Sequence, residues 1–168
     1  MRFSRIALLF ALGFSATLFA ADIQFEGKTL SDWEAQAQSG TEAARYSAIQ
    51  TCAKARDKAA VPILCAILLN KDESRNLRYE SAEALGDIAD PSSAASLLTA
   101  LKDTDEHLRI WTIRALGVTG IGNPDVKAAL AQAQTSDSSA KVREKAAAAL
   151  KQIAEIEAQI DQQQTTGN

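Results

Sequence analysis

The sequence predicts an all-α protein in which about three and a half helix-turn-helix repeats stack as a right-handed α-solenoid. The first observation behind this prediction is a register of four arginines spaced by 33, 31 and 34 residues, namely Arg45, Arg78, Arg109 and Arg143. The second is that apolar residues recur just before each arginine and four and seven positions after it. The third is that no segment alternates with the period of two that strands show. Repeats of this length bury their apolar faces against one another.

The second repeat shows the expected helix pair most clearly. Its first helix is expected over 76–88, where apolar residues recur at helical spacing. Because proline disfavours helix in the residue before it and suits the first turn of a new helix, the chain is expected to turn at Pro91. A second helix is then expected over 92–101.

The same plan predicts helix pairs on both sides of this repeat. The expected helices are 42–55 and 59–69 upstream, and 106–116 and 124–133 downstream. A capping-box pattern at 31–34 predicts a short helix before the first pair, since such a pattern satisfies the free N–H groups at a helix start. Trp33 in this helix is expected to cover the end of the stack.

The last helix is expected to extend past the repeat pattern. Its apolar residues are spaced alternately by four and three, as in a heptad seam: Val142, Ala146, Ala149, Ile153, Ile156 and Ile160. Such a seam either caps the stack or pairs with another chain, which would make the protein a weak homo-oligomer. We favour capping, because the last repeat has no second helix to cover its apolar side. Residues 162–168 are expected to form a disordered tail.

The first 21 residues have the pattern of a secretory signal peptide. Arg2 and Arg5 precede an apolar run over 6–14, and Ala20 and Ala21 mark the expected cleavage site. The alternative of an uncleaved membrane anchor is disfavoured, because the run is shorter than the roughly 20 residues of a spanning helix. We expect an exported protein, periplasmic or secreted, that does not insert in a membrane after cleavage. The expected division is a signal peptide at 1–21, an N-terminal segment with its capping helix at 22–40, a repeat domain at 41–161 and the tail at 162–168.

The charge of the chain argues against nucleic acid as a partner. The sequence has 18 Lys and Arg residues and 21 Asp and Glu residues, a net charge of −3. Loss of Arg2 and Arg5 with the signal peptide leaves 16 basic residues against 21 acidic ones, a net charge of −5. Nucleic acid favours a basic stripe, whereas these charges are interspersed and acidic on balance.

The segment 77–103 resembles the short HEAT-like repeat of the phycobilisome lyase family. The shared pattern is Leu-Arg, alanine-rich positions, Ala-Leu-Gly, Asp-Pro and then Leu-x-x-Leu-Lys-Asp. The resemblance is good over 108–117 and partial over 142–153, where Lys151 replaces the glycine. In the first unit, Cys52-Ala53 stands where Leu-Gly is usual. The resemblance implies an α-solenoid that binds proteins.

The chain does not carry the chemistry of enzymes that contain this repeat. HEAT-like hydroxylases hold two irons with repeated His-Glu pairs, whereas this chain has one histidine, His107, and a di-iron site needs several ligands. No phosphate-binding loop or serine-nucleophile motif is present. We therefore expect no catalytic residue, cofactor or metal, and a scaffold that binds a protein partner. The alternatives are an enzyme or cofactor-handling protein of the HEAT-like lyase or hydroxylase type, and a structural unit that self-associates through the C-terminal helix.

Four large side chains are candidates for contact with that partner. The two positions after each register arginine point away from the apolar face, and most of them hold small or charged residues. The exceptions are Tyr46, Tyr79, Ile110 and Trp111. Exposed aromatic residues of this kind dominate protein interfaces. The alternative is that these side chains fill the seams between repeats.

Cys52 and Cys65 are candidates for a disulfide. They occupy core positions in the two helices of the first pair and lie at similar distances from the turn near Asp57. An exported protein meets an oxidising compartment, in which such a bridge persists. The alternative is two small buried side chains, because helices packed about 8–10 Å apart often leave Cα atoms too distant for a bridge.

Overall fold

Side-chain caps fix where most of the helices begin. The free N–H groups of a first turn are satisfied by a hydroxyl, carboxylate or amide oxygen at the residue before it. Such caps come from Thr29, Thr41, Ser74, Asp105 and Asn123. Two other helices follow a 3-10 turn, and Asp57 and Asp90 cap those turns instead.

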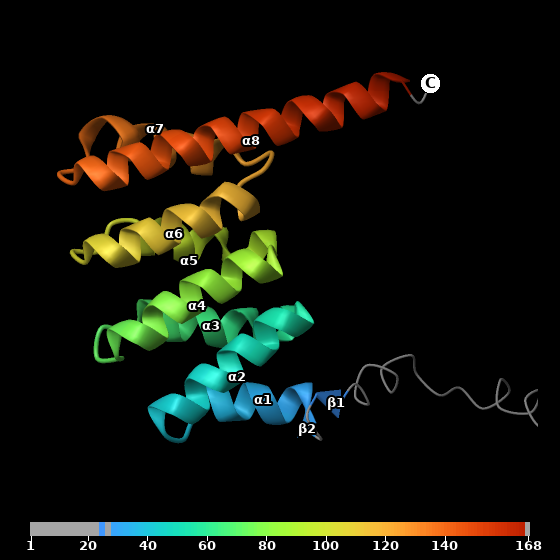
Figure 1. Cartoon of the computed structure of the whole chain (residues 1–168), viewed down its shortest axis with the longest axis vertical. Helices are drawn as coiled ribbons and strands as arrows, with labels where there is room; N and C mark the ends of the chain where they lie inside the picture. The colour runs from blue at the N-terminus through green and yellow to red at the C-terminus, as the bar shows by residue number, and fades with distance from the viewer. Residues whose placement is uncertain (1–23, 26–27, 167–168) are drawn as a thin grey trace, which may run out of the picture.

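The computed structural model of the protein describes residues 24–25 and 28–166. Within these residues the α-helices are α1 (Leu30–Gln38), α2 (Glu42–Ala55), α3 (Val61–Leu69), α4 (Arg75–Ile88), α5 (Ala94–Ala100), α6 (Glu106–Thr119), α7 (Pro124–Ser136) and α8 (Ala140–Thr166). They stack one pair on the next along the long axis (Figure 1). The expected all-α solenoid is confirmed.

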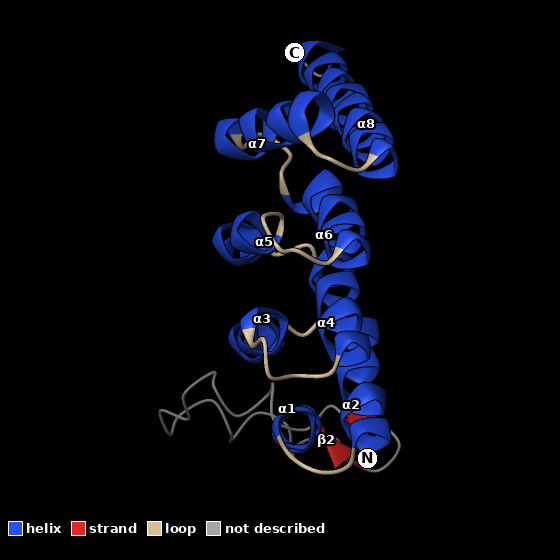
Figure 2. Cartoon of the chain, turned by 90° about the vertical axis from the view of Figure 1, so that its left-hand side faces the viewer, coloured by secondary structure: helices blue, strands red, loops and turns tan. Residues whose placement is uncertain are grey.

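The helices form two layers. The first helices of the pairs, α2, α4 and α6, lie in one layer with α8, while α1, α3, α5 and α7 lie in the other (Figure 2). The first-helix layer carries the register arginines and the two positions that follow each of them. It therefore holds every residue that the sequence proposes for partner contact.

The core lies between the layers and along the seams between repeats. Its largest fully buried side chains come from equivalent repeat positions, which confirms the register: Ile49, Leu64, Leu68, Leu77, Leu85, Leu97, Leu108, Ile113, Leu116, Val126, Leu130 and Ile153. Gly86, in the Ala-Leu-Gly motif, lies where α4 approaches α6 closely. A Cβ atom there would lie 3.0 Å from the Cα atom of Ala115, so a larger residue would push the two helices apart.

The register arginines tie each repeat to the next. Each donates to one or two backbone carbonyl oxygens of the turn or helix end before it. The first three also donate to a carboxylate in the turn after them. The ion pairs are Arg45–Glu73, Arg78–Asp103 and Arg109–Asp137. In the last pair, the Nε and Nη2 atoms of Arg109 lie 2.9 and 2.8 Å from the two carboxylate oxygens of Asp137. Such fork-shaped pairing suits guanidinium and carboxylate.

The structure corrects three details of the expected fold. The capping box of α1 is formed by Thr29 and Asp32, so the helix begins at Leu30 rather than after Ser31. Two short antiparallel strands, β1 (Gln24–Phe25) and β2 (Lys28–Thr29), precede it. The third correction concerns α8, which continues through residues expected to form a disordered tail as far as Thr166, the last residue that the structure describes.

The predicted signal peptide at 1–21 lies outside the described residues. Among the helices that the structure describes, none combines the length and the apolar character needed to cross a membrane.

Candidate partner-binding face

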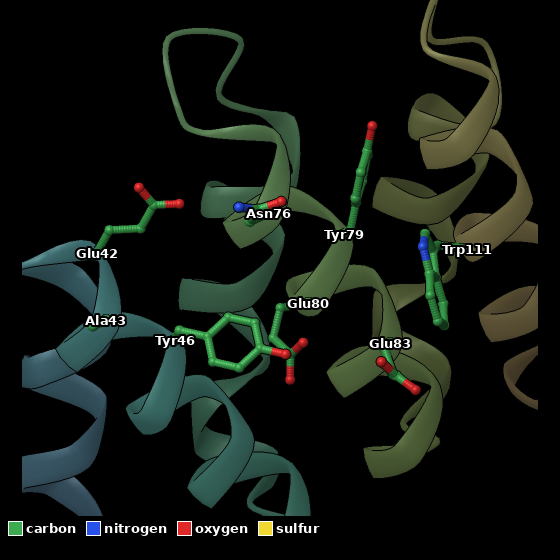
Figure 3. A pocket seen from close by; sticks show the side chains of 8 residues that line it. All are labelled: Glu42, Ala43, Tyr46, Asn76, Tyr79, Glu80, Glu83 and Trp111. Carbon is green, nitrogen blue, oxygen red and sulfur yellow. The ribbon is translucent and has the colours of Figure 1, made fainter.

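The first-helix layer is hollowed where α2, α4 and α6 meet. The hollow has a volume of about 870 Å³, and we call it the acidic hollow (Figure 3). Its lining residues are Glu42, Ala43, Tyr46, Asn76, Tyr79, Glu80, Glu83 and Trp111. Three of the four residues that the sequence nominated therefore come together here from three successive repeats.

Tyr46 lies across the mouth of the hollow with its hydroxyl beside the carboxylate of Glu80 (Figure 3). The ring belongs to α2 and is 38% exposed, which agrees with the predicted outward position. Its hydroxyl donates a hydrogen bond to Glu80, and this bond raises the pKa of Tyr46 because the phenol holds its proton for the carboxylate. Tyr46 thus joins an exposed aromatic surface to a buried charge.

Glu80 corrects an expectation, because the sequence placed it at a position that points to solvent. In the structure it is only 8% exposed, since the packing of α2 on α4 covers it. Its carboxylate accepts hydrogen bonds from Tyr46 and Gln50 of α2. Burial raises the pKa of Glu80, and the like charges of Glu83 and Asp87 raise it further. No lysine or arginine of the described residues forms an ion pair with it.

Tyr79 forms an upright wall of the hollow. Its hydroxyl points away from Glu80 and donates to the carboxylate of Asp105 at 2.5 Å (Figure 3). Burial of the phenol, with the adjacent negative charge of Asp105, raises the pKa of Tyr79 to about 12. Because Asp105 also caps α6, the ring is held in place by the turn between two repeats.

Trp111 divides the acidic hollow from a second, smaller hollow between α6 and α8. Its ring is half-buried, and the guanidinium of Arg114 lies 5.4 Å from the ring centroid. The same guanidinium lies 2.9 Å from a carboxylate oxygen of Glu83. The second hollow has a volume of about 360 Å³, and Ile110 lines it together with Trp111 and Lys145. Ile110 therefore lies on the same layer as the other three nominated residues but not in the acidic hollow.

Sequence reasoning missed the carboxylates of this face. The residue that pairs with Tyr46 is Glu80, which follows it by 34 positions, one repeat further along the chain. This separation of one repeat length is the sequence signal that could have identified the pair. A comparison of equivalent repeat positions does not show which residues face each other across a seam.

Both candidate disulfide cysteines are free thiols in the structure. Burial raises the pKa of Cys52 to about 12, and the nearby charges of Asp57 and Glu34 raise it as well. Cys65 is half-buried, and burial raises the pKa of its thiol although the Ser96 hydroxyl donates a hydrogen bond to it. The two thiols have different neighbours, which agrees with the alternative of two small packed side chains.

The described part of the chain holds no group of three or more His, Cys, Asp or Glu residues placed to bind a metal ion. His107 has a side chain that is 70% exposed at the start of α6 and lies 3.9 Å from a carboxylate oxygen of Asp105.

Solved structures similar to this chain are also stacked-helix solenoids. A designed armadillo repeat protein in complex with the peptide (KR)4 has a TM-score of 0.59 at 19% identity, covering 74% of this chain and 64% of that one. A computationally designed armadillo repeat protein for modular peptide recognition has a TM-score of 0.59 at 18% identity, covering 76% and 65%. The complex of CpcE and CpcF of phycocyanin lyase from Nostoc sp. has a TM-score of 0.56 at 21% identity, covering 77% and 56%.

This chain spans less than two thirds of the length of each of these structures. At such identities the likeness shows the fold alone. No curated protein matches the sequence. The family model for HEAT repeats, in contrast, matches residues 30–117 and 94–162, which together cover α1 and most of the structure that follows it. With its register arginines and paired helices, the chain belongs to the HEAT-repeat family.

Proposed function

We propose that this chain is an exported, non-catalytic scaffold that binds a protein partner through its first-helix layer. The observation that carries the proposal is the meeting of Tyr46, Tyr79 and Trp111 in one hollow on that layer. Aromatic side chains that line a concave surface are frequent anchors of protein interfaces. Ile110 extends the same surface toward α8.

The similar structures support a partner of this class. One is a peptide complex and another is a complex of two protein chains, and both have the same stacked-helix architecture. Stacked repeats present an extended surface on which a partner contacts several units at once. The export part of the proposal depends on the signal-peptide pattern of residues 1–21.

Site-specific photocrosslinking in the native host tests the proposal. A benzophenone amino acid at Tyr46 is expected to give a discrete protein adduct, and the protein recovered is expected to lack its first 20 or 21 residues by intact mass. The matched control places the same group at Ala95, which is exposed on α5 in the other layer. Equal adducts from both positions, or none from Tyr46, would contradict the proposed face. An unprocessed N-terminus would contradict export.

A further inference from the structure

The acidic hollow is lined by three carboxylates, and the most buried of them, Glu80, forms no ion pair with a lysine or arginine of the described residues. Glu42 accepts a hydrogen bond from the Ser74 hydroxyl at 2.7 Å, and Glu83 pairs with Arg114. Glu80 has only the neutral donors Tyr46 and Gln50. A buried carboxylate without a cationic partner destabilises a fold. Its presence in a hollow that opens to solvent is explained if a partner supplies the cation.

The walls of the hollow suit the same charge. Tyr46, Tyr79 and Trp111 line the same hollow as Glu80, with Tyr46 beside its carboxylate (Figure 3), and aromatic ring faces attract ammonium and guanidinium groups. The chain already shows this chemistry at the edge of the hollow, where Arg114 lies over the Trp111 ring and pairs with Glu83. Aromatic walls around a carboxylate form a site for a cationic side chain.

We propose that the acidic hollow binds a lysine or arginine side chain from a basic segment of the partner protein, with Glu80 as the pairing carboxylate. This inference rests on the proposed scaffold function and specifies the chemistry of its partner. A volume of about 870 Å³ exceeds that of one side chain, so backbone and neighbouring residues of the segment fit as well. The net charge of −3 for the whole chain favours approach of a basic segment.

Binding of this kind depends on pH in a definite direction. The groups that face Glu80 are Tyr46 and Gln50 from α2, with Glu83 and Asp87 on its own helix, and none of them is cationic. The ionised form of Glu80 attracts the partner cation, whereas the protonated form does not. Affinity for a basic segment therefore falls as the pH is lowered through the raised pKa of Glu80.

The test uses a fluorescent octapeptide of alternating lysine and arginine, measured by anisotropy at about 50 mM salt, where ionic contacts are weakly screened. The protein is expected to bind this peptide and not a neutral peptide of equal length. E80Q is expected to weaken binding about tenfold, the loss typical of a charge-assisted hydrogen bond. The matched control is E144Q, which removes the same charge from an exposed position of α8 and is expected to change affinity by less than about twofold.

A second variant guards against a folding defect in E80Q. Y46L keeps the Glu80 carboxylate but removes the exposed ring and its hydrogen bond to Glu80, and it is expected to weaken the same binding by about threefold. The inference is overturned if the basic peptide does not bind, or if E80Q and E144Q weaken it equally. In that case an unchanged crosslinked adduct at Tyr46 would leave the scaffold function standing. Absence of that adduct from the protein that carries benzophenone at Tyr46 would remove the scaffold function itself.

Discussion

At the scale of single residues, equivalent repeat positions have different surroundings. Ser47, Glu80, Trp111 and Lys145 occupy the second position after each register arginine. Ser47 and Lys145 are exposed, as the pattern predicted, whereas Glu80 is buried and Trp111 is half-buried. Glu80 is buried because the Tyr46 side chain of the preceding repeat lies against it. Trp111 is therefore both an interface candidate and a seam residue.

Replacing Trp111 by alanine is expected to lower the free energy of unfolding by about 2 kcal/mol. A fully buried tryptophan costs about 3–5 kcal/mol when truncated, and half-burial reduces that loss. Loss of the cation–π contact with Arg114 accounts for about 0.5–1 kcal/mol of this decrease. Urea unfolding followed by circular dichroism measures the difference.

The matched control for Trp111→Ala is Tyr46→Ala, which removes a more exposed ring from the same hollow and should cost less than about 1 kcal/mol. If Trp111→Ala left stability unchanged, its ring would be a free surface anchor. A loss above about 4 kcal/mol would instead make it a core residue, and its part in partner binding would be withdrawn.

At the scale of elements, α8 combines two roles along its length. Its first half packs on α6 and α7, and Ile153 is fully buried there. Glu157 accepts a hydrogen bond from the backbone N–H of Gly122 at 2.8 Å and pairs with Lys127, so it fastens the loop before α7. Beyond it the helix extends past the stack (Figure 1), and Ile160 is 41% exposed. The capping role therefore ends near Glu157.

Two truncations separate the cap from the projecting end of α8. A chain that ends after Ala158 keeps Ile153 and Glu157 and is expected to retain its stability within about 0.5 kcal/mol, as exposed surface changes usually do. A chain that ends after Gln152 loses both residues. Its free energy of unfolding is expected to be lower by at least about 3 kcal/mol. Thermal unfolding measures both differences.

Light scattering on the same truncated chains addresses self-association. If α8 only caps the stack, the chain that ends after Ala158 should have the same oligomeric state as the full chain. A fall from dimer to monomer on this truncation would show that the projecting end joins two copies. It would also favour the alternative in which the heptad seam pairs with a second chain.

The elements that were predicted well have local signals, and those predicted poorly depend on contacts between repeats. The expected helix 42–55 agrees with α2 because its cap, Thr41, and its apolar spacing lie within one segment. The start of α1 was misplaced because two capping patterns overlap there, and the structure uses the earlier one at Thr29. The acidic hollow could be foreseen only in part, since the burial of Glu80 depends on a ring from the preceding repeat.

At the scale of the whole molecule, the three arginine–carboxylate pairs join all the turns between repeats. A hydrogen bond from Arg45 holds the pKa of Glu73 below its ordinary value, and one from Arg109 does the same for Asp137. A carboxylate with a lowered pKa in the folded state stabilises the fold above its unfolded pKa. That stability is lost as the pH falls through the folded pKa. Glu80, with a raised pKa, acts in the opposite direction.

Acid is therefore expected to weaken the stack through these turns, and the Asp137→Asn substitution tests this directly. At pH 7 the free energy of unfolding of the variant should be lower by about 3 kcal/mol, because the buried Arg109 charge no longer has a carboxylate partner. The difference should shrink as the pH falls through the lowered pKa of Asp137, since the carboxylate is then protonated in the native protein as well. The matched control is Asp72→Asn, an exposed residue of an earlier turn, which should change stability by less than about 0.5 kcal/mol. Chemical unfolding between pH 2 and 7 measures both, and a gap for Asp137→Asn that stayed constant across this range would show that the ion pair does not couple the repeats.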